Sequence, residues 1–178
     1  GGSVGQMNGY LSDGRYEVSD FESYNEASDT WMLNSGVTDN SGVIGKLRPG
    51  MLKLKDITGD GIVNVDDNTI IGDANPLSTG GFNIAGRFYG FDLSALFSWS
   101  YGNDVYNANK IEYTSTSKYQ YRNMIDIMEG GKRWNNIDAS GNIVNDPAAL
   151  AALNANTTNW SPFMNKFVFS DWAVEDGS

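Results

Sequence analysis

The sequence lacks two residue types that carry much of the chemistry of enzymes, because it contains no cysteine and no histidine. Their absence excludes thiolate nucleophiles, imidazole bases, Ser-His-Asp triads and the usual zinc sites. A catalytic site would have to use a carboxylate pair or a bound metal ion. The absence of cysteine fits a secreted or envelope protein, but a cytosolic protein can lack cysteine too, so it does not decide the compartment.

Basic residues are scarce, since 12 lysines and arginines face 22 acidic residues, which gives a formal net charge of −10. Proteins that bind nucleic acids normally carry a basic patch, and none is visible in this sequence. We therefore expect no nucleic-acid partner. The acidic residues gather in the regions between apolar patterns, which indicates cation binding or simple solvation.

Long hydrophobic runs are also missing, because no apolar stretch is long enough to form a transmembrane helix. Residues 1–5 are neither basic nor followed by an apolar run, so they do not resemble a signal peptide. Any contact with a membrane must therefore be made by β-strands.

The residues that are abundant indicate an all-β fold. Glycine occurs 21 times, aromatic residues make up 12% of the chain, and Asn, Asp, Ser and Thr are frequent. This mixture suits short antiparallel strands separated by long polar loops, and it argues against a helical bundle.

Weak patterns predict the elements of the first third of the chain. Residues 1–19 predict a strand over Val4–Tyr16 that ends in a turn at Ser12–Gly14. Residues 20–50 are polar and predict a loop, with a helical turn near Glu22–Ala27.

The remaining segments outside the central pattern are predicted in the same way. Residues 51–75 predict a short strand, Met51–Lys55, followed by an acidic loop, and residues 103–178 predict one long loop. Three features are expected within that long loop: a helix around Tyr121–Met128, a helix from Pro147 to about Leu153 with Asp146 as N-cap, and a terminal loop, Trp160–Ser178, without a closing strand.

The clearest pattern lies in residues 81–102, where apolar and polar residues alternate on both sides of Tyr89-Gly90. A two-residue turn at Tyr89-Gly90 would make a hairpin in which apolar residues face one another on one side. The predicted pairs are Phe88 with Phe91, Gly86 with Leu93, Ile84 with Ala95, and Phe82 with Phe97. A slip of one residue would mix the two faces, so the register is self-consistent.

This hairpin has the features of a transmembrane β-hairpin. Each strand carries roughly nine to eleven alternating residues, enough to cross a bilayer when tilted. The predicted faces are a lipid-facing side with Ile84, Leu93, Ala95 and Phe97, an inward side with Arg87, Asp92 and Ser94, and an aromatic girdle of Phe82, Trp99 and Tyr101. A strand of a soluble β-sandwich alternates in the same way, and one hairpin cannot separate the two readings.

The lengths of the connections favour the membrane reading. The Tyr89-Gly90 turn is minimal, whereas the connections at the other end run to dozens of residues, and outer-membrane barrels have short periplasmic turns and long extracellular loops. We therefore predict that Tyr89-Gly90 lies at the periplasmic rim. The acidic loop and residues 103–178 should lie at the opposite, extracellular end.

The acidic loop, Asp56–Asp67, matches the twelve-residue calcium loop position by position. Gly61 occupies the sixth position, where a sharp turn needs a residue without Cβ, and Ile62 or Val63 could anchor the loop to the rest of the chain. The predicted oxygen ligands of a structural Ca²⁺ are Asp56, Thr58, Asp60, the Ile62 carbonyl, Asn64 and Asp67. The alternative is an Asx-rich turn that is held by hydrogen bonds from side chains to the backbone, with no ion.

Several separated blocks of residues together resemble a known family. The chain is similar to the C-terminal part of SusC/RagA-type TonB-dependent transporters. The blocks are Gly5-Gln6, Gly9-Tyr10, Asp13-Gly14, Pro49-Gly50, Lys55–Asn64 with Asp67, Thr69–Gly72, Asn75-Pro76, Gly81–Asn83, Gly90–Ser94, Ser100–Asn107, Asp171-Trp172 and Glu175–Ser178.

This resemblance implies a fold, a location and a set of partners. It implies a bacterial outer-membrane barrel of about 22 strands with an N-terminal plug, which imports oligosaccharides or peptides. It also implies a SusD-like surface lipoprotein as partner, energy delivered by TonB, and contact with outer-membrane lipid. The chain itself contains no plug and no segment that would contact TonB, and its few predicted strands could not close a barrel. We therefore expect it to act together with the remainder of the same barrel.

Two other functions compete with the transporter reading. One is a soluble, calcium-stabilised β-sandwich module that binds glycans. In this reading and in the transporter reading alike, the aromatic residues available to stack on sugars are Tyr119, Tyr121, Trp134 and Trp160. The other is a glycosidase with a carboxylate pair among Asp104, Glu112, Asp126 and Glu129. No spacing singles out a pair, so we predict that the chain is not an enzyme.

Overall fold

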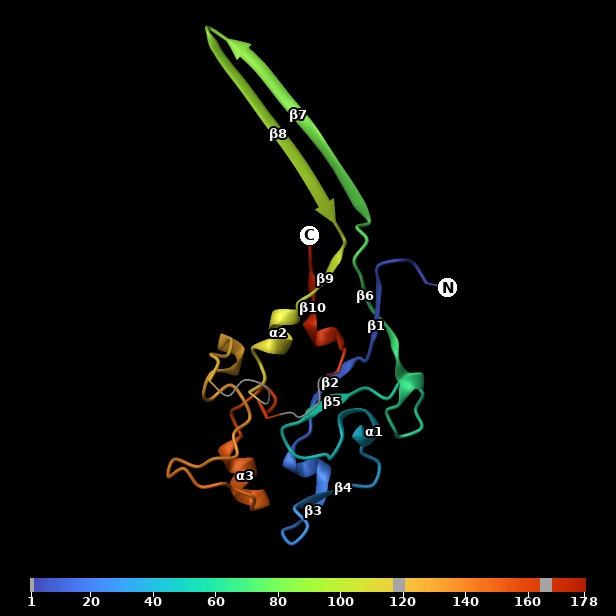
Figure 1. Cartoon of the computed structure of the whole chain (residues 1–178), viewed down its shortest axis with the longest axis vertical. Coiled ribbons are helices and arrows are strands. Elements are labelled where there is room, and N and C mark those ends of the chain that lie inside the picture. Colours follow the sequence, from blue (N-terminus) through green and yellow to red (C-terminus); the bar gives the residue numbers. More distant parts are fainter. Residues whose placement is uncertain (1, 117–120, 164–167) are drawn as a thin grey trace.

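A long antiparallel hairpin extends from a packed body in the computed structural model of the chain, which describes residues 2–116, 121–163 and 168–178 (Figure 1). The hairpin consists of β7 (Ser78–Phe88) and β8 (Phe91–Tyr101). The segments before and after the hairpin in the sequence fold against each other at its base (Figure 1). The body therefore depends on both halves of the chain.

Short antiparallel pairs of strands form most of the regular structure of the body. The pairs are β1 (Gln6–Gly9) with β6 (Thr69–Asp73), β2 (Ser12–Arg15) with β5 (Leu52–Leu54), β3 (Phe21–Asn25) with β4 (Thr30–Leu33), and β9 (Asp104–Tyr106) with β10 (Val174–Asp176). Strands thus make up most of the regular secondary structure of the described residues, as the all-β prediction requires.

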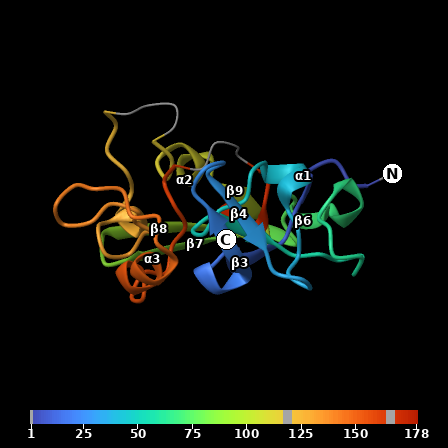
Figure 2. The same ribbon diagram turned by 90° about the horizontal axis from the view of Figure 1, so that it is seen from below.

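The helices are few and short. They are α1 (Ser41–Ile44), α2 (Ala108–Glu112) and α3 (Pro147–Leu153), with 3-10 turns η1 (Val18–Asp20), η2 (Val65–Asp67), η3 (Asp126–Met128) and η4 (Asp171–Ala173). Within the described part of the chain, no helix is long and apolar enough to cross a membrane. Seen from below, α3 lies on the opposite side of the body from α1 and β6 (Figure 2).

The hydrophobic core joins residues from both halves of the sequence. Trp134 and Leu150 pack into an apolar cluster of the first half, which contains Tyr16, Phe21, Trp31, Ile44, Leu47, Met51, Leu52, Leu54 and Val63. The buried Tyr16 hydroxyl donates to the Thr38 carbonyl (2.5 Å), and burial raises the pKa of Tyr16. Because burying a large apolar side chain contributes about 1.5–3 kcal/mol, this cluster is the main source of stability of the body.

Polar contacts of Arg15 connect β2 to the second half of the chain. The Arg15 guanidinium donates to the carbonyl oxygens of Asn159 (2.7 Å) and Thr157 (2.8 Å). It also lies 4.8 Å from the ring centroid of Trp134, in a cation–π contact. One side chain thus fixes the position of a segment more than a hundred residues away.

The structure corrects the loop that the sequence predicts over residues 20–50. Strands β3 and β4 form a hairpin there, followed by α1, and the residues expected to make a helical turn near Glu22–Ala27 belong to β3 and its turn. The reason is aromatic packing, since the ring of Trp31 lies 5.6 Å from that of Phe21 and 4.9 Å from that of Tyr24.

The turn predicted at Ser12–Gly14 is wrong as well, because these residues form β2. Ser12 pairs with Leu54 and Arg15 with Leu52, with a register irregularity between the two pairs. Gly14 has a φ of 76°, so the same glycine that suggests a turn instead permits this bulge. The short strand expected at Met51–Lys55 is confirmed as β5.

The second half of the chain contains more regular secondary structure than the long loop that the sequence predicts. Trp160–Ser178 contains a closing strand, β10, which pairs with β9. The helix expected around Tyr121–Met128 is wrong except for η3 at its end. The helix expected from Pro147 is confirmed as α3, and the Asp146 carboxylate caps it by accepting from the Ala149 amide (2.8 Å).

Candidate functional site

The hairpin of β7 and β8 has the register that the sequence predicts. Phe88 pairs with Phe91, Gly86 with Leu93, Ile84 with Ala95, and Phe82 with Phe97. At the turn, Tyr89 has a φ of 46° and Gly90 a φ of 86°. Two consecutive residues in the left-handed region make the primed turn that follows the twist of antiparallel strands.

One face of the hairpin is a continuous apolar surface. The rings of Phe82 and Phe97 stack with centroids 4.8 Å apart. Phe88, Phe91 and Leu93 expose 74%, 80% and 68% of their surfaces. No described residue outside the hairpin covers this face, so the hairpin lacks the dry partner layer that a soluble sandwich strand would have.

The opposite face is largely polar. Arg87 and Asp92 face each other across the two strands and form an ion pair next to the turn. The Ser94 hydroxyl lies 3.4 Å from the Asn83 side-chain oxygen. Ala85 and Leu96 are the apolar exceptions on this face, and Leu96 is 79% exposed.

The turn of the hairpin and the acidic loop lie at opposite ends of β7 and β8, as the lengths of the connections predict. The Tyr89-Gly90 turn lies at one end of the strands, and the body with its acidic loop lies at the other (Figure 1). At the base, β6 leads into β7 and β8 leads into β9, with β1 beside β6 and β10 beside β9. The Asp104 carboxylate accepts from the Asp73 amide (2.8 Å) and connects β9 to β6.

The acidic loop is organised around the fully buried carboxylate of Asp67. Asp67 Oδ1 accepts from the amides of Ile57 (2.8 Å) and Thr58 (3.0 Å) and from the Thr58 hydroxyl (3.1 Å). Asp67 Oδ2 accepts from the Asn64 amide (2.9 Å). These hydrogen bonds, led by that of Asn64, lower the pKa of Asp67 to about 2, so the group is charged at neutral pH.

The side-chain oxygens of three other predicted ligands also accept hydrogen bonds from nearby backbone amides. Asp56 accepts from Gly59 (2.6 Å) and Gly61 (2.7 Å), and Asp60 accepts from Ile62 (2.9 Å). The Asn64 side chain accepts from the Asp66 amide (2.7 Å) and caps η2. Gly61 has a φ of 88°, which agrees with the predicted need for a residue without Cβ at the sharp turn.

Val63, not Ile62, anchors the loop to the body. Val63 is fully buried in the core, whereas Ile62 is 52% exposed. The backbone of Asp39 also holds the loop here. Its amide donates to the Gly61 carbonyl (2.9 Å), and its carbonyl accepts from the Val63 amide (2.9 Å). The sequence gives no signal for Asp39, since its partners lie more than twenty residues away.

The donor set of the loop fits a hard cation in its chemistry, because it offers carboxylate, hydroxyl, amide and carbonyl oxygens within one short segment. In the present arrangement the Thr58 hydroxyl connects Asp56 (3.2 Å) and Asp67 (3.1 Å), while Asp60 and Asn64 bond to their own neighbours. Among the residues that the structure describes, no three acidic side chains form a ready metal-binding group. A bound ion would therefore require the side chains of the loop to rearrange from these hydrogen bonds.

The aromatic residues considered for sugar stacking differ in exposure. Tyr121 is fully exposed, but Trp134 is 3% exposed and lies beneath Arg15. Trp160 packs on Trp172 with ring centroids 4.5 Å apart. Tyr119 lies outside the described residues.

Three of the four carboxylates considered for a glycosidase have separate partners. Glu112 pairs with Arg122, and Glu129 pairs with Lys132 (3.0 Å). Asp104 is bonded to the Asp73 amide. These partners support structural roles for the three groups.

Comparison with known proteins identifies a relative for most of the chain. No protein-family model matches the sequence. The chain is 29% identical over 126 residues to the TonB-dependent receptor P3 of Formosa agariphila. The match covers 71% of this chain and 11% of that receptor, so the chain spans about a tenth of the length of its relative. The chain is therefore similar to part of a TonB-dependent receptor, and its mainly β-stranded regular structure agrees with that similarity.

Proposed function

We propose that the chain is a barrel segment of a SusC/RagA-type TonB-dependent transporter, and that β7 and β8 cross the outer membrane. The observation that carries this proposal is the apolar face of the hairpin, whose large side chains each expose about half or more of their surface, namely Phe82, Ile84, Phe88, Phe91, Leu93 and Phe97. The strands have 11 residues each. At about 3.4 Å per residue and a tilt of about 45°, such a strand covers about 26 Å, the height of the apolar band of outer-membrane barrels.

The free edges of the hairpin support a place within a larger barrel. Within the described residues, β7 and β8 pair only with each other, which leaves the outer N–H and C=O groups of both strands without partners. Such groups are not tolerated in lipid. Strands β1 and β10 flank the hairpin at its base, so adjoining segments of a longer chain would be positioned to pair with β7 and β8.

The body would then form part of the extracellular mouth of the transporter, where cargo enters. The cargo class is oligosaccharides or peptides, with a SusD-like lipoprotein as the partner at the surface. TonB would supply energy through a part of the transporter outside this chain. The alternative, a soluble glycan-binding module, explains neither the exposed apolar face nor the similarity to a TonB-dependent receptor.

The Asp56–Asp67 loop is proposed to hold a structural Ca²⁺. The ligands would be Asp56, Thr58, Asp60, the Ile62 carbonyl, Asn64 and Asp67. A divalent cation would offset most of the charge of three carboxylates that otherwise repel one another. Because Val63 fixes the loop to the core, ordering it would stabilise the approach of the chain to β6 and then to β7.

Lipid contact of the hairpin tests the proposed function. The chain has no cysteine. Once any cysteine outside this chain has been replaced by serine, single cysteines can be labelled with the fluorophore NBD in the natural full-length protein, reconstituted in liposomes. We expect nitroxide-labelled acyl chains to quench NBD at Ala95→Cys and Ile84→Cys. The adjacent positions of opposite facing, Ser94→Cys and Ala85→Cys, should escape quenching. Equal quenching at all four positions, or at none, would contradict the proposal.

A further inference from the structure

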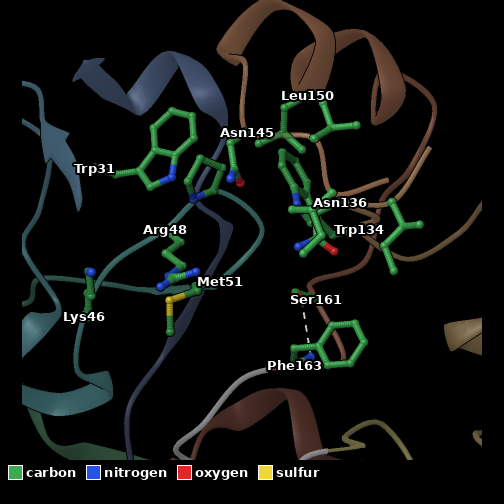
Figure 3. Close-up of a pocket in the computed structure, with 14 residues that line it drawn as sticks. Trp31, Lys46, Arg48, Met51, Trp134, Asn136, Asn145, Leu150, Ser161 and Phe163 are labelled. Carbon is green, nitrogen blue, oxygen red and sulfur yellow. Dashed lines mark hydrogen bonds between the residues drawn. The ribbon is translucent and has the colours of Figure 1, made fainter. Parts of the chain in front are cut away.

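A cavity of about 450 Å³ lies in the body, far from the hairpin, and belongs to neither the membrane face nor the acidic loop (Figure 3). Its volume is within the usual range of small-ligand pockets, about 300–1,000 Å³. Trp31, Lys46, Arg48 and Met51 of the first half of the chain lie on one side, and Trp134, Asn136 and Leu150 of the second half lie on the other (Figure 3).

The floor of this pocket is apolar. Trp31, Met51, Trp134 and Leu150 line it, and each exposes less than a tenth of its surface. Ile143 and Phe163 stand at its mouth, where they are 69% and 58% exposed. An apolar group that entered the pocket would therefore leave water along most of its surface.

The rim of the pocket is cationic, although the chain as a whole is strongly acidic. Lys46 and Arg48 line the pocket with side chains 46% and 47% exposed, and no described residue that lines it is an Asp or a Glu. Both cations share one carboxylate, Asp29, at 3.9 Å from Lys46 and 2.5 Å from Arg48. Two positive charges against one negative charge leave a local excess that an anionic group can balance.

Two side-chain amides are available at the same place. Asn136 and Asn145 line the pocket, and no hydrogen bond of either side-chain amide to a described residue is present. An amide group can donate to a carbonyl and accept from an N–H at once, which matches the needs of a peptide bond.

The rings in the floor are unsuited to stacking on a sugar. Stacking needs an open ring face, but Trp134 is covered by the Arg15 guanidinium at 4.8 Å and is 3% exposed. Trp31 is 8% exposed and packs on Phe21 and Tyr24. The pocket thus favours insertion of an apolar side chain over stacking of a pyranose ring.

We propose that this pocket binds the C-terminus of a peptide: the apolar last side chain enters the floor, the terminal carboxylate meets Arg48 and Lys46, and Asn136 and Asn145 bond to the last peptide group. The inference deepens the proposed function, because it assigns peptides as the cargo class captured at the mouth. It requires only the folded body, so it can be tested apart from membrane insertion.

The test is fluorescence anisotropy with the whole chain in detergent micelles. The probe is Gly-Gly-Ser-Leu with fluorescein at its N-terminus, compared with the same peptide carrying a C-terminal amide. We expect the free acid to bind at least about tenfold more tightly than the amide, because the amide loses the charge-assisted hydrogen bonds to Arg48. A peptide that ends in glycine in place of leucine should also lose about tenfold or more.

Substitutions in the pocket test whether it is the source of the preference for the free acid and of the preference for leucine. Arg48→Gln should abolish the preference for the free acid, whereas Lys132→Gln, which removes a similarly exposed cation outside the pocket, should keep it. Ile143→Ser, at the exposed mouth, should reduce the preference for leucine over glycine without changing the preference for the free acid. Circular dichroism of each variant verifies that the body is folded.

Three results would overturn the proposal. The first is equal affinity for acid and amide, and the second is loss of binding in Lys132→Gln to the same degree as in Arg48→Gln. The third is displacement of the peptide by trigalacturonate with higher affinity, which would make the carboxylate ligand a sugar acid. None of these results would affect the lipid contact of the hairpin, so failure of this inference is distinct from failure of the proposed function.

Discussion

Phe82 and Phe97 face each other across the hairpin with nearly parallel rings, 4.8 Å between centroids and 18° between planes. Both belong to the face that carries Ile84, Leu93 and Ala95. In a soluble domain such a pair would be covered by a second layer, but here both rings remain about half exposed. The pair lies near the middle of the strands, so it belongs to the apolar face itself, whereas Trp99 and Tyr101 lie at the base, where an interfacial aromatic girdle would be.

The tight turn of the hairpin should depend on one glycine. Gly90 has a φ of 86°, so Gly90→Ala should destabilise the hairpin by about 1–2 kcal/mol, the usual cost of a left-handed non-glycine residue. Gly86→Ala is the matched control, because no atom lies within 4 Å of its added Cβ and its φ is not positive. Urea unfolding in detergent measures both. Equal stabilities of the two variants would contradict a primed turn at this position.

Asp67→Asn should loosen the acidic loop even without calcium. The amide nitrogen of asparagine cannot accept, so the variant loses at least one of the hydrogen bonds to the amides of Ile57, Thr58 and Asn64. Leaving a buried donor unpaired costs about 1–3 kcal/mol. Hydrogen exchange at these three amides should accelerate, whereas Asp66→Asn, at an exposed side chain, should leave them unchanged. Unaltered exchange in Asp67→Asn would show that Asp67 does not organise the loop.

Calcium should stabilise the loop if the proposed ligands bind it. At a free concentration about 100 times the dissociation constant, one site adds about 2.7 kcal/mol to the free energy of unfolding of the calcium-bound unit. Calorimetric titration should give one site, with Mg²⁺ weaker because it requires a tighter octahedron. Asp60→Asn should weaken this binding, and Asp66→Asn should not. If saturating calcium produced neither binding heat nor a shift in the thermal unfolding temperature, the loop would not be a calcium site.

The ion pair between Lys110 and Glu175 should give the closing strand a pH dependence. Lys110 Nζ lies 2.8 Å from Glu175 Oε1, and this contact lowers the pKa of Glu175. Since the pKa is lowered in the folded state, the contribution of the pair is fully present above the ordinary glutamate pKa of about 4.3 and is lost as the pH falls through the lowered value. An NMR titration of the Glu175 carboxyl should show a midpoint below that of a model peptide, and Lys110→Gln should raise it. A midpoint at or above the ordinary value would contradict the contact.

Local sequence patterns predict those elements whose residues lie close together in the sequence, and they fail where the fold depends on contacts between distant residues. The hairpin register follows from alternation over twenty consecutive residues, and α3 follows from Asp146-Pro147, so both are predicted correctly. The body is held instead by contacts such as Arg15 with Thr157 and Trp134 with Met51 and Leu150, for which local patterns give no signal. Residues 20–50 are polar enough to suggest a loop, but packing of Trp31 against Phe21 and Tyr24 holds β3 and β4 together as a hairpin.

The same distinction applies to the acidic loop and to the pocket beside Arg48. The residues of the acidic loop are adjacent in sequence, so their spacing predicts the sharp turn at Gly61. The pocket beside Arg48 is assembled from both halves of the chain, and no spacing could have indicated it.

The most direct test of the account compares Ala95→Arg with Ser94→Arg, two adjacent positions on β8 with opposite facing. The measurement is the free energy of unfolding of the natural full-length protein from phospholipid bilayers. The account predicts that Ala95→Arg costs about 2–4 kcal/mol, the value for arginine facing lipid near the midplane, and that Ser94→Arg costs far less because it faces the lumen. Equal costs at the two positions, or a larger cost at Ser94, would contradict the transmembrane hairpin.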